Sequence, residues 1–344
     1  MNAKITRDNR DILLHDMSLR DGMHAKKEQI EVAQMVAIAK ALDSANVPLI
    51  QVTHGAGLGG NSLQYGFAVA SNEEYIEAVA QEMSQALISV LLIPGIGTIA
   101  ELESAYRAGA RSVHVATHCT EADTSPAHIG RARELGMDTT GFLMMAHLND
   151  PAGLARQGRL MESYGAQTVY VTDSAGFLMP DDVTARIKSL REALRPVTEI
   201  GFHAHHNLGM GVANSIAAVR AGATRIDASL GGMGAGAGNC PIEIFAAACE
   251  RLSIRTGADL FALMDAAEDI VSPLLDEPIR VDRAALTLGY AGVYSTFLHK
   301  SKLVAEKHGL AVRDLLVELG RRRMIGGQED MIEDTAIDMK RAAP

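Results

Sequence analysis

The sequence predicts a TIM (β/α)8 barrel followed by a helical C-terminal extension. Short apolar runs alternate with amphipathic stretches eight times, and eight strand–helix units in about 250 residues are what such a barrel requires. Polar residues follow several of these runs, as at the catalytic mouth of a barrel. An open doubly wound sheet is the alternative, but residues 18–22 after the first run lack its glycine-rich fingerprint.

The expected strands are short apolar runs, typical of strands that are buried on both faces of a parallel sheet. They cover residues 12–17, 49–53, 88–93, 112–116, 139–145, 168–172, 199–202 and 225–229.

The expected helices are amphipathic stretches that start and stop with recognisable signals. Pro126 and Pro180 suit the first turn of a helix, and Asp181 and Asp182 favour a helix N-terminus. Glycines at 109, 136, 165 and 222 follow four stretches, where they can adopt the left-handed conformation that ends a helix. The stretches cover residues 28–44, 73–84, 99–108, 126–135, 151–164, 180–194, 211–221 and 242–255.

A change of pattern divides the chain in two. Pro273 and Pro278 interrupt the alternation, and helix-like runs follow at residues 282–288, 294–308, 312–323 and 330–340. We therefore assign residues 1–271 to a barrel that carries the site and residues 272–344 to a helical domain. That domain is either a stabilising cap or a lid and partner surface.

Composition limits the class of protein. The chain has 344 residues with a net charge of −10, which argues against nucleic-acid binding because that needs a basic face. The longest apolar stretch, residues 86–100, contains Pro94, Gly95 and Gly97, so we expect no membrane span. Residues 1–11 are polar and lack the core of a signal peptide, so a cytoplasmic protein is expected.

Two segments far apart in the chain together predict a metal site. His203 and His205 alternate at the end of the seventh expected strand, so their imidazoles can share one face. Asp21 follows the first strand and would add a carboxylate oxygen, giving a site with open positions for substrate. The positively charged side chain of Arg20, next to Asp21, is suited to stabilise negative charge that develops on a substrate. Either segment alone is a weak signal, since Asp-Gly is also a common turn.

Further polar side chains follow other strands. His54, His118 and Ser174 are expected at the same rim, where each alone is better explained by a structural hydrogen bond. Together they would make the rim suitable for a small anionic substrate. His24 is a candidate general base, because the ordinary pKa of histidine suits proton transfer near neutrality.

The most glycine-rich stretch, residues 231–239, follows the eighth strand and allows two interpretations. Barrels often bind phosphate at this position. We favour a tight loop that passes close to substrate or metal, because no lysine follows to hold a phosphate.

Long motifs in this order resemble the family of 4-hydroxy-2-oxovalerate aldolases, which are pyruvate-dependent class II aldolases of aromatic meta-cleavage pathways. That family belongs to the larger group of barrels related to hydroxymethylglutaryl-CoA lyase and isopropylmalate synthase. The motifs are HDMSLRDGMH at 15–24, LLIPGIGT at 91–98, VATHCTEAD at 115–123, GFLMMAH at 141–147, YVTDSAG at 170–176, HAHHNLGMGVANSIAA at 203–218, GAGAGN at 234–239, LTLGYAGVYSTFL at 286–298 and GGQEDMIEDTA at 326–336.

The resemblance implies a reaction and roles for residues. A 4-hydroxy-2-oxoacid would be cleaved to pyruvate and an aldehyde, with Mn²⁺, or alternatively Co²⁺ or Mg²⁺, as the metal. By this resemblance the metal ligands would be Asp21, His203 and His205. The catalytic residues would be Arg20, His24 and Tyr294, and the substrate-binding residues would be Arg20, Ser174, His203 and Tyr294. Arg20 would steady the pyruvate enolate, and His24 would take the C4 hydroxyl proton.

The resemblance also implies partners. The family forms a complex with an acylating, NAD- and CoA-dependent acetaldehyde dehydrogenase, and passes the aldehyde through a tunnel. We expect that contact at the C-terminal helices and at Gly326 and Gly327, with a homodimer as the core of the assembly.

One departure from the family pattern lies near the second strand. Gln51 and Ala56 stand where the family usually has Glu and Asp, so two carboxylates are missing. We expect activity to be retained, with altered metal orientation or aldehyde preference. The alternatives are a non-catalytic partner subunit of the dehydrogenase, or a related acyl-CoA lyase or condensing enzyme.

Overall fold

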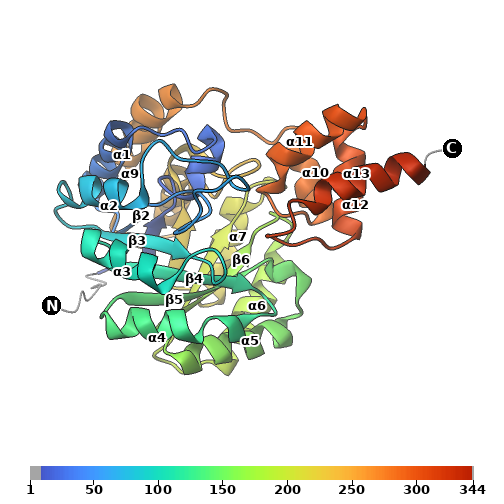
Figure 1. The fold of residues 1–344 in the computed structure, drawn as a ribbon. Coiled ribbons are helices and arrows are strands. Elements are labelled where there is room, and N and C mark those ends of the chain that lie inside the picture. Colours follow the sequence, from blue (N-terminus) through green and yellow to red (C-terminus); the bar gives the residue numbers. More distant parts are fainter. Residues whose placement is uncertain (1–8, 343–344) are drawn as a thin grey trace.

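Eight parallel strands close into a barrel in the computed structural model, which describes residues 9–342 (Figure 1). Each strand pairs with its neighbours in chain order, and β1 pairs with β8. The expected TIM barrel is therefore confirmed. Residues 1–8, within the segment where we expect no signal peptide, lie outside the described part of the chain, as do residues 343 and 344.

All eight expected strands are present with small differences at their ends. They are β1 Leu13–Asp16, β2 Leu49–Gln51, β3 Leu87–Leu92, β4 Ser112–His118, β5 Asp138–Met144, β6 Thr168–Asp173, β7 Glu199–Ala204 and β8 Arg225–Ala228.

Helices surround the barrel and pack their apolar faces against the outer face of the strands. One continuous core fills this layer, from Ile12 at the first strand to Val271 at the end of the barrel. The helices are α1 Val32–Ser44, α2 Asn72–Ala80, α3 Ile99–Ala108, α4 Pro126–Glu134, α5 Pro151–Tyr164, α6 Pro180–Ala193, α7 Gly211–Ala221, α8 Ile242–Arg251 and α9 Leu260–Asp265.

Local sequence signals start and end these helices. At α2, the Ser71 hydroxyl accepts from the Glu74 amide at 3.2 Å, and the Glu74 carboxylate accepts from the Ser71 amide at 2.8 Å. This reciprocal pair satisfies two amides that lack helical partners. The glycines expected to end helices, at 109, 136, 165 and 222, all have positive φ.

The observed helices differ from the expected ranges at several ends, and one helix was not expected. The helix expected from residue 28 begins at Val32, because Lys27 and Glu28 adopt left-handed backbone angles, with φ of 50° and 67°. A short 3-10 helix, Asp21–Lys26, precedes them instead. The unexpected helix is α9, which continues into a π-helical turn at Ala266–Val271.

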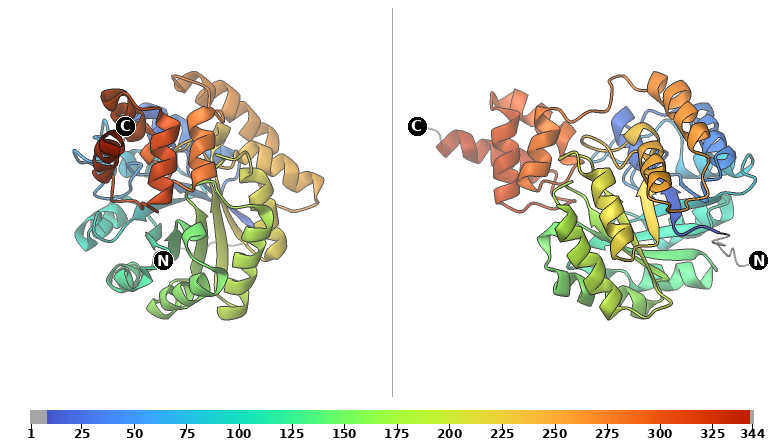
Figure 2. Two further views of the ribbon diagram at one scale, coloured as in Figure 1. Left: turned by 90° about the vertical axis from the view of Figure 1, so that its right-hand side faces the viewer. Right: turned by 180° about the vertical axis from the view of Figure 1, so that it is seen from behind.

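The C-terminal extension has a hydrophobic core of its own, built around Leu288, Phe297, Leu316 and Ile332. It consists of α10 Arg283–Ala291, α11 Phe297–His308, α12 Val312–Arg321 and α13 Met331–Ala342. These helices stand together at one end of the barrel (Figures 1 and 2).

Hydrogen bonds attach the extension to the loops at the barrel mouth. The Asn207 side-chain amide donates to Ser295 Oγ at 2.8 Å, and Ser295 Oγ donates to the Ser174 carbonyl at 2.7 Å. Gln64 Nε2 donates to Glu329 Oε2 at 2.7 Å. The extension is thus fixed directly above the carboxyl ends of the strands.

Within the described part of the chain, none of the helices combines the length and apolar character needed to cross a bilayer.

Substitutions at two glycines would show how tightly the barrel interior is packed. A Cβ at Gly201 on β7 would overlap the buried Tyr170 ring, whereas a Cβ at Gly130 on α4 would meet no atom within 4 Å. We expect Gly201→Ala to destabilise the protein by about 1–3 kcal/mol through overpacking. Gly130→Ala should stabilise it by about 0.5–1 kcal/mol through helix propensity. Urea unfolding of both variants measures the difference, and equal effects would contradict this account of the packing.

Candidate active site

A cavity of about 730 Å³ opens at the barrel mouth, between the carboxyl ends of the strands and the C-terminal extension. The seven residues to which the family resemblance gives a role all line it: Arg20, Asp21, His24, Ser174, His203, His205 and Tyr294. Residues of the extension also contribute, including Ile325, Gly326 and Gly327.

Asp21, His203 and His205 form a compact set of donor atoms. One ligand atom from each lies within 4.8 Å of the others, and all three residues are buried. The two Nε2 atoms are 3.4 Å apart, and His205 Nε2 is 3.9 Å from Asp21 Oδ2. One ion with bonds of about 2.0–2.2 Å can reach these donors after small movements. The set therefore fits a divalent cation.

The other ring nitrogens of both histidines already have partners. His203 Nδ1 lies 3.0 Å from Asp227 Oδ2, and His205 Nδ1 lies 3.2 Å from the Ala235 carbonyl. These acceptors favour a proton on Nδ1, which leaves the Nε2 lone pairs free for a cation. Burial lowers the pKa of both imidazoles to about 4, so both are neutral at pH 7.

The charges of Asp21 and Arg20 are coupled at the cavity floor. Burial alone would raise the pKa of Asp21, but the Arg20 guanidinium 2.7 Å away holds it well below its ordinary value. Arg20 Nε also donates to Gln51 Oε1 at 2.6 Å. Gln51 thus positions the guanidinium without adding a negative charge, which a glutamate there would do.

His24 forms a pair with Glu28, a residue that sequence reasoning missed. His24 Nδ1 lies 2.9 Å from Glu28 Oε1, and the Gly55 amide donates to Glu28 Oε2 at 2.8 Å. Burial disfavours the charged His24 ring, but the Glu28 carboxylate outweighs this and raises the pKa of His24. The His–Glu spacing of four was visible in the sequence, but residue 28 had been assigned to a helix.

Ser174 and Tyr294 lie on the side of the cavity towards the extension. Ser174 Oγ accepts a hydrogen bond from the Met145 amide at 2.9 Å, so its own proton remains available for donation. Burial raises the pKa of Tyr294 well above its ordinary value, so the phenol is protonated at neutral pH.

Of the other rim residues, His118 lines the cavity but His54 does not. The His54 ring is buried, accepts from the Ala56 amide at 3.0 Å through Nδ1, and faces the Glu28 carboxylate. The expectation that His54 lies at the rim was therefore wrong, because its own loop turns it inward.

The glycine-rich loop passes beside the candidate ligands. Its Ala235 carbonyl faces His205, its Ala235 amide donates to Asp21 at 3.4 Å, and a Cβ at Gly234 would come within 2.8 Å of Asp21. This is the close approach that the tight-loop interpretation predicted.

Comparison with known proteins gives matches over nearly the whole chain. The HMGL-like family matches residues 11–270, and the DmpG-like communication domain matches residues 279–341. 4-Hydroxy-2-oxovalerate aldolase 1 of Azoarcus sp. (strain BH72) is 71% identical over 332 residues, covering 96% of each chain. 4-Hydroxy-2-oxovalerate aldolase 3 of Azotobacter vinelandii is 71% identical over 333 residues, covering 97% of this chain and 95% of that one.

Among solved structures, the carboxyl transferase domain of Rhizobium etli pyruvate carboxylase has a similar fold. The TM-score is 0.80 at 17% identity, covering 97% of this chain and 61% of that one.

Removal of one ligand tests the donor set. We expect His205→Ala to weaken Mn²⁺ binding at least tenfold, because one nitrogen donor is lost. His118→Ala, a change in the same cavity outside the donor set, should leave the affinity within about twofold. Titration of the metal-free proteins with Mn²⁺, followed by electron paramagnetic resonance of the free ion, measures both. Equal affinities for His205→Ala and the unchanged protein would contradict the assignment.

Proposed function

We propose that this chain, which belongs to the 4-hydroxy-2-oxovalerate aldolase family, cleaves 4-hydroxy-2-oxovalerate to pyruvate and acetaldehyde. Members of this family are carbon–carbon lyases. The observation that carries this proposal is the meeting of seven chemically suited residues in one cavity. Related 4-hydroxy-2-oxoacids would be cleaved in the same way.

A divalent cation would be held by Asp21, His203 and His205, and we propose Mn²⁺. When bound, it would supply a Lewis acid that stabilises negative charge on the oxygen atoms of the 2-keto acid. The two neutral imidazoles and the ionised carboxylate support this assignment, because all three have lone pairs available at neutral pH.

The other residues act on protons and charge. His24 would accept the C4 hydroxyl proton at Nε2, since its Nδ1 faces Glu28. Loss of that proton leads to cleavage of the C3–C4 bond. The C4 fragment leaves as the aldehyde, and the electron pair of the broken bond remains on the pyruvate unit as enolate charge. Arg20, held by Gln51 and Asp21, would stabilise that charge.

Ser174 and Tyr294 would orient the substrate from the side of the cavity next to the extension. The Ser174 hydroxyl would donate to the keto-acid end, and the protonated Tyr294 phenol would contact the substrate near His24. Since Tyr294 belongs to the C-terminal extension, we propose that residues 272–344 complete the site above the barrel of residues 1–271, as a lid.

The extension carries a communication domain, and we propose that it binds an acylating acetaldehyde dehydrogenase. Gly326 and Gly327 line the cavity on the side of the extension, and a Cβ at Gly326 would come within 2.9 Å of the Tyr294 ring. We propose that the product path starts here, where small residues leave room beside Tyr294. A homodimer as the core of the assembly stays a prediction.

Metal-dependent release of pyruvate is the central test. The protein is treated with a chelator, checked to be metal-free, and supplied with racemic 4-hydroxy-2-oxopentanoate before and after addition of Mn²⁺. Lactate dehydrogenase and NADH report the pyruvate. We expect release only with metal, whereas release from the metal-free protein, or none with metal bound, would contradict the proposal.

The His24–Glu28 pair predicts a change in pH dependence. His24 acts in its neutral form, so activity should fall as the pH drops below its raised pKa. Glu28→Gln removes the negative charge that raises this pKa, so the acid limb of kcat/KM should move to lower pH. His24→Ala should lower kcat about 10²–10⁴-fold, as expected for a general base.

A control separates this effect from general damage. Glu329→Gln, a carboxylate change at the same cavity mouth, should leave the acid limb in place. An acid limb that stays unchanged in Glu28→Gln would remove His24 as the titrating group.

A further inference from the structure

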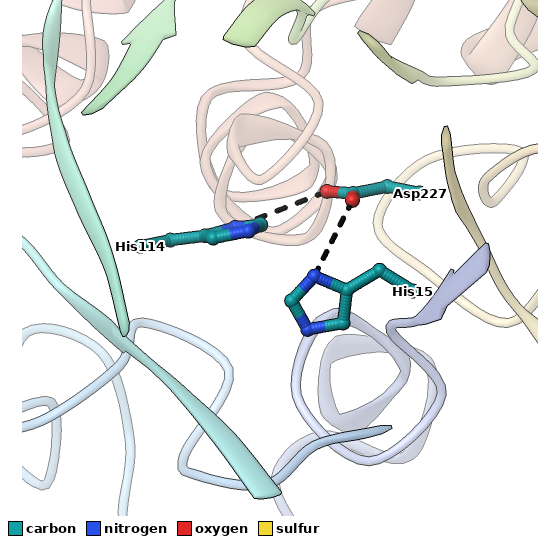
Figure 3. A group of neighbouring side chains, drawn as sticks. All are labelled: His15, His114 and Asp227. Atoms are coloured by element: carbon teal, nitrogen blue, oxygen red, sulfur yellow. Dashed lines mark ion pairs between the residues drawn. The ribbon is translucent and has the colours of Figure 1, made fainter. Parts of the chain in front are cut away.

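A second cluster of polar side chains lies inside the barrel, and one of its members contacts the candidate metal ligand His203. His15 from β1, His114 from β4 and Asp227 from β8 point towards one another (Figure 3). All three are fully buried or nearly so. None of them lines the cavity or has a role in the proposed reaction.

Among the three histidines around Asp227, the candidate ligand His203 makes the shortest contact. Asp227 Oδ2 lies 3.0 Å from His203 Nδ1, within hydrogen-bond range. The contacts with the other two histidines are longer: Asp227 Oδ1 lies 3.7 Å from His15 Nδ1, and Asp227 Oδ2 lies 3.9 Å from His114 Nδ1. The pairing of β7 with β8 places His203 directly beside Asp227, so the backbone itself sets this contact.

This contact selects one form of the His203 ring. A carboxylate beside Nδ1 favours the tautomer that carries its proton there, and leaves the Nε2 lone pair exposed. That Nε2 lies 3.4 Å from His205 Nε2. The carboxylate also increases the basicity of the ring nitrogen that would bind a cation.

The two other histidines near Asp227, His15 and His114, are electrically neutral. The His15 and His114 rings meet edge to face with centroids 4.6 Å apart, and His114 stacks on Phe142 at 4.9 Å. Burial lowers the pKa of His15 to about 4 and that of His114 well below its ordinary value, so both are neutral. They therefore do not compete with His203 as charged donors to Asp227.

We propose that Asp227 is a positioning residue that fixes the tautomer and orientation of His203 from inside the barrel, and thereby sets the affinity of the site for its cation. The proposal rests on the proposed function, because it takes His203 as a metal ligand. His15 and His114 pack beside the carboxylate at 3.7 Å and 3.9 Å, beyond hydrogen-bond distance, and leave His203 as its closest histidine.

The same three residues could instead hold a cation of their own, since their ligand atoms lie within 4.8 Å of one another. The contacts favour the positioning role. The Asp227 oxygen nearest His114 is also the one at 3.0 Å from His203 Nδ1, so it is already used as an acceptor. The experiment distinguishes the two by metal stoichiometry.

Two substitutions separate hydrogen bonding from charge. Asp227→Asn keeps an oxygen that can accept from His203 Nδ1 but removes the charge, whereas Asp227→Leu removes both. We expect Mn²⁺ affinity to fall about tenfold in the first and about 100-fold in the second, the range found when partners of metal-bound histidines are lost. If Asp227→Leu does not fold, Asp227→Asn decides alone.

Asp16→Asn is the matched control. Asp16 is also a fully buried carboxylate on a barrel strand, but it accepts from Ser18 and has no contact with His203. Burial raises the pKa of both Asp16 and Asp227 to about 7, so the titrations are made at pH 8, where the carboxylate form prevails. The control should bind Mn²⁺ like the unchanged protein.

A spectroscopic readout accompanies the affinities. Nitrogen-15 NMR of the metal-free protein should show His203 protonated at Nδ1, and this preference should be reduced in Asp227→Leu. A purely structural role would lower thermal stability without changing the tautomer.

Any one of three results would overturn the proposal. Asp227→Asn could bind Mn²⁺ within about twofold of the affinity of the unchanged protein, or Asp227→Leu could keep the same His203 tautomer. The protein could also bind two ions, of which only one depends on Asp227. If the unchanged protein binds no Mn²⁺, the proposed function fails instead, and the tautomer alone still decides the role of Asp227.

Discussion

Closure of the parallel barrel is the constraint on which the site depends. It brings the carboxyl ends of all eight strands to one mouth, so that Asp21, after β1, meets His203 at the end of β7. The register of β7 and β8 sets His203 beside Asp227. A slip of one residue would turn His203 to the outer face of the barrel and remove it from the site. Strand pairing and site geometry are therefore determined together.

Much of this arrangement follows from patterns that are local in the sequence. The alternation of apolar runs and amphipathic stretches predicted all eight strands and the barrel, because each unit has its own start and stop signals. The period of two along a strand predicted that His203 and His205 share a face, and their Nε2 atoms do lie 3.4 Å apart. Family motifs then added Tyr294, which lies in the extension and could not have been placed by periodicity.

What could not be predicted depends on contacts between distant segments or on unusual backbone angles. Glu28 was assigned to a helix because left-handed angles at a non-glycine residue leave no clear signal in the sequence. Asp227 looked like an ordinary strand residue, since its partner His203 lies on another strand. His54 was expected at the rim, but the amide of Ala56 and the nearby Glu28 carboxylate hold its ring inside the loop.

The distance along the chain between the candidate ligands has a thermodynamic consequence. Asp21 and His203 meet only when the first and seventh strands are both in place, so the unfolded chain offers no comparable set of donors. A cation that binds only the folded protein adds its binding free energy to the stability of the fold, by about 2.7 kcal/mol at a concentration 100 times its Kd. The ion would thus link the segment after β1 to β7. The same residues would then contribute both to the reaction and to the stability of the closed barrel.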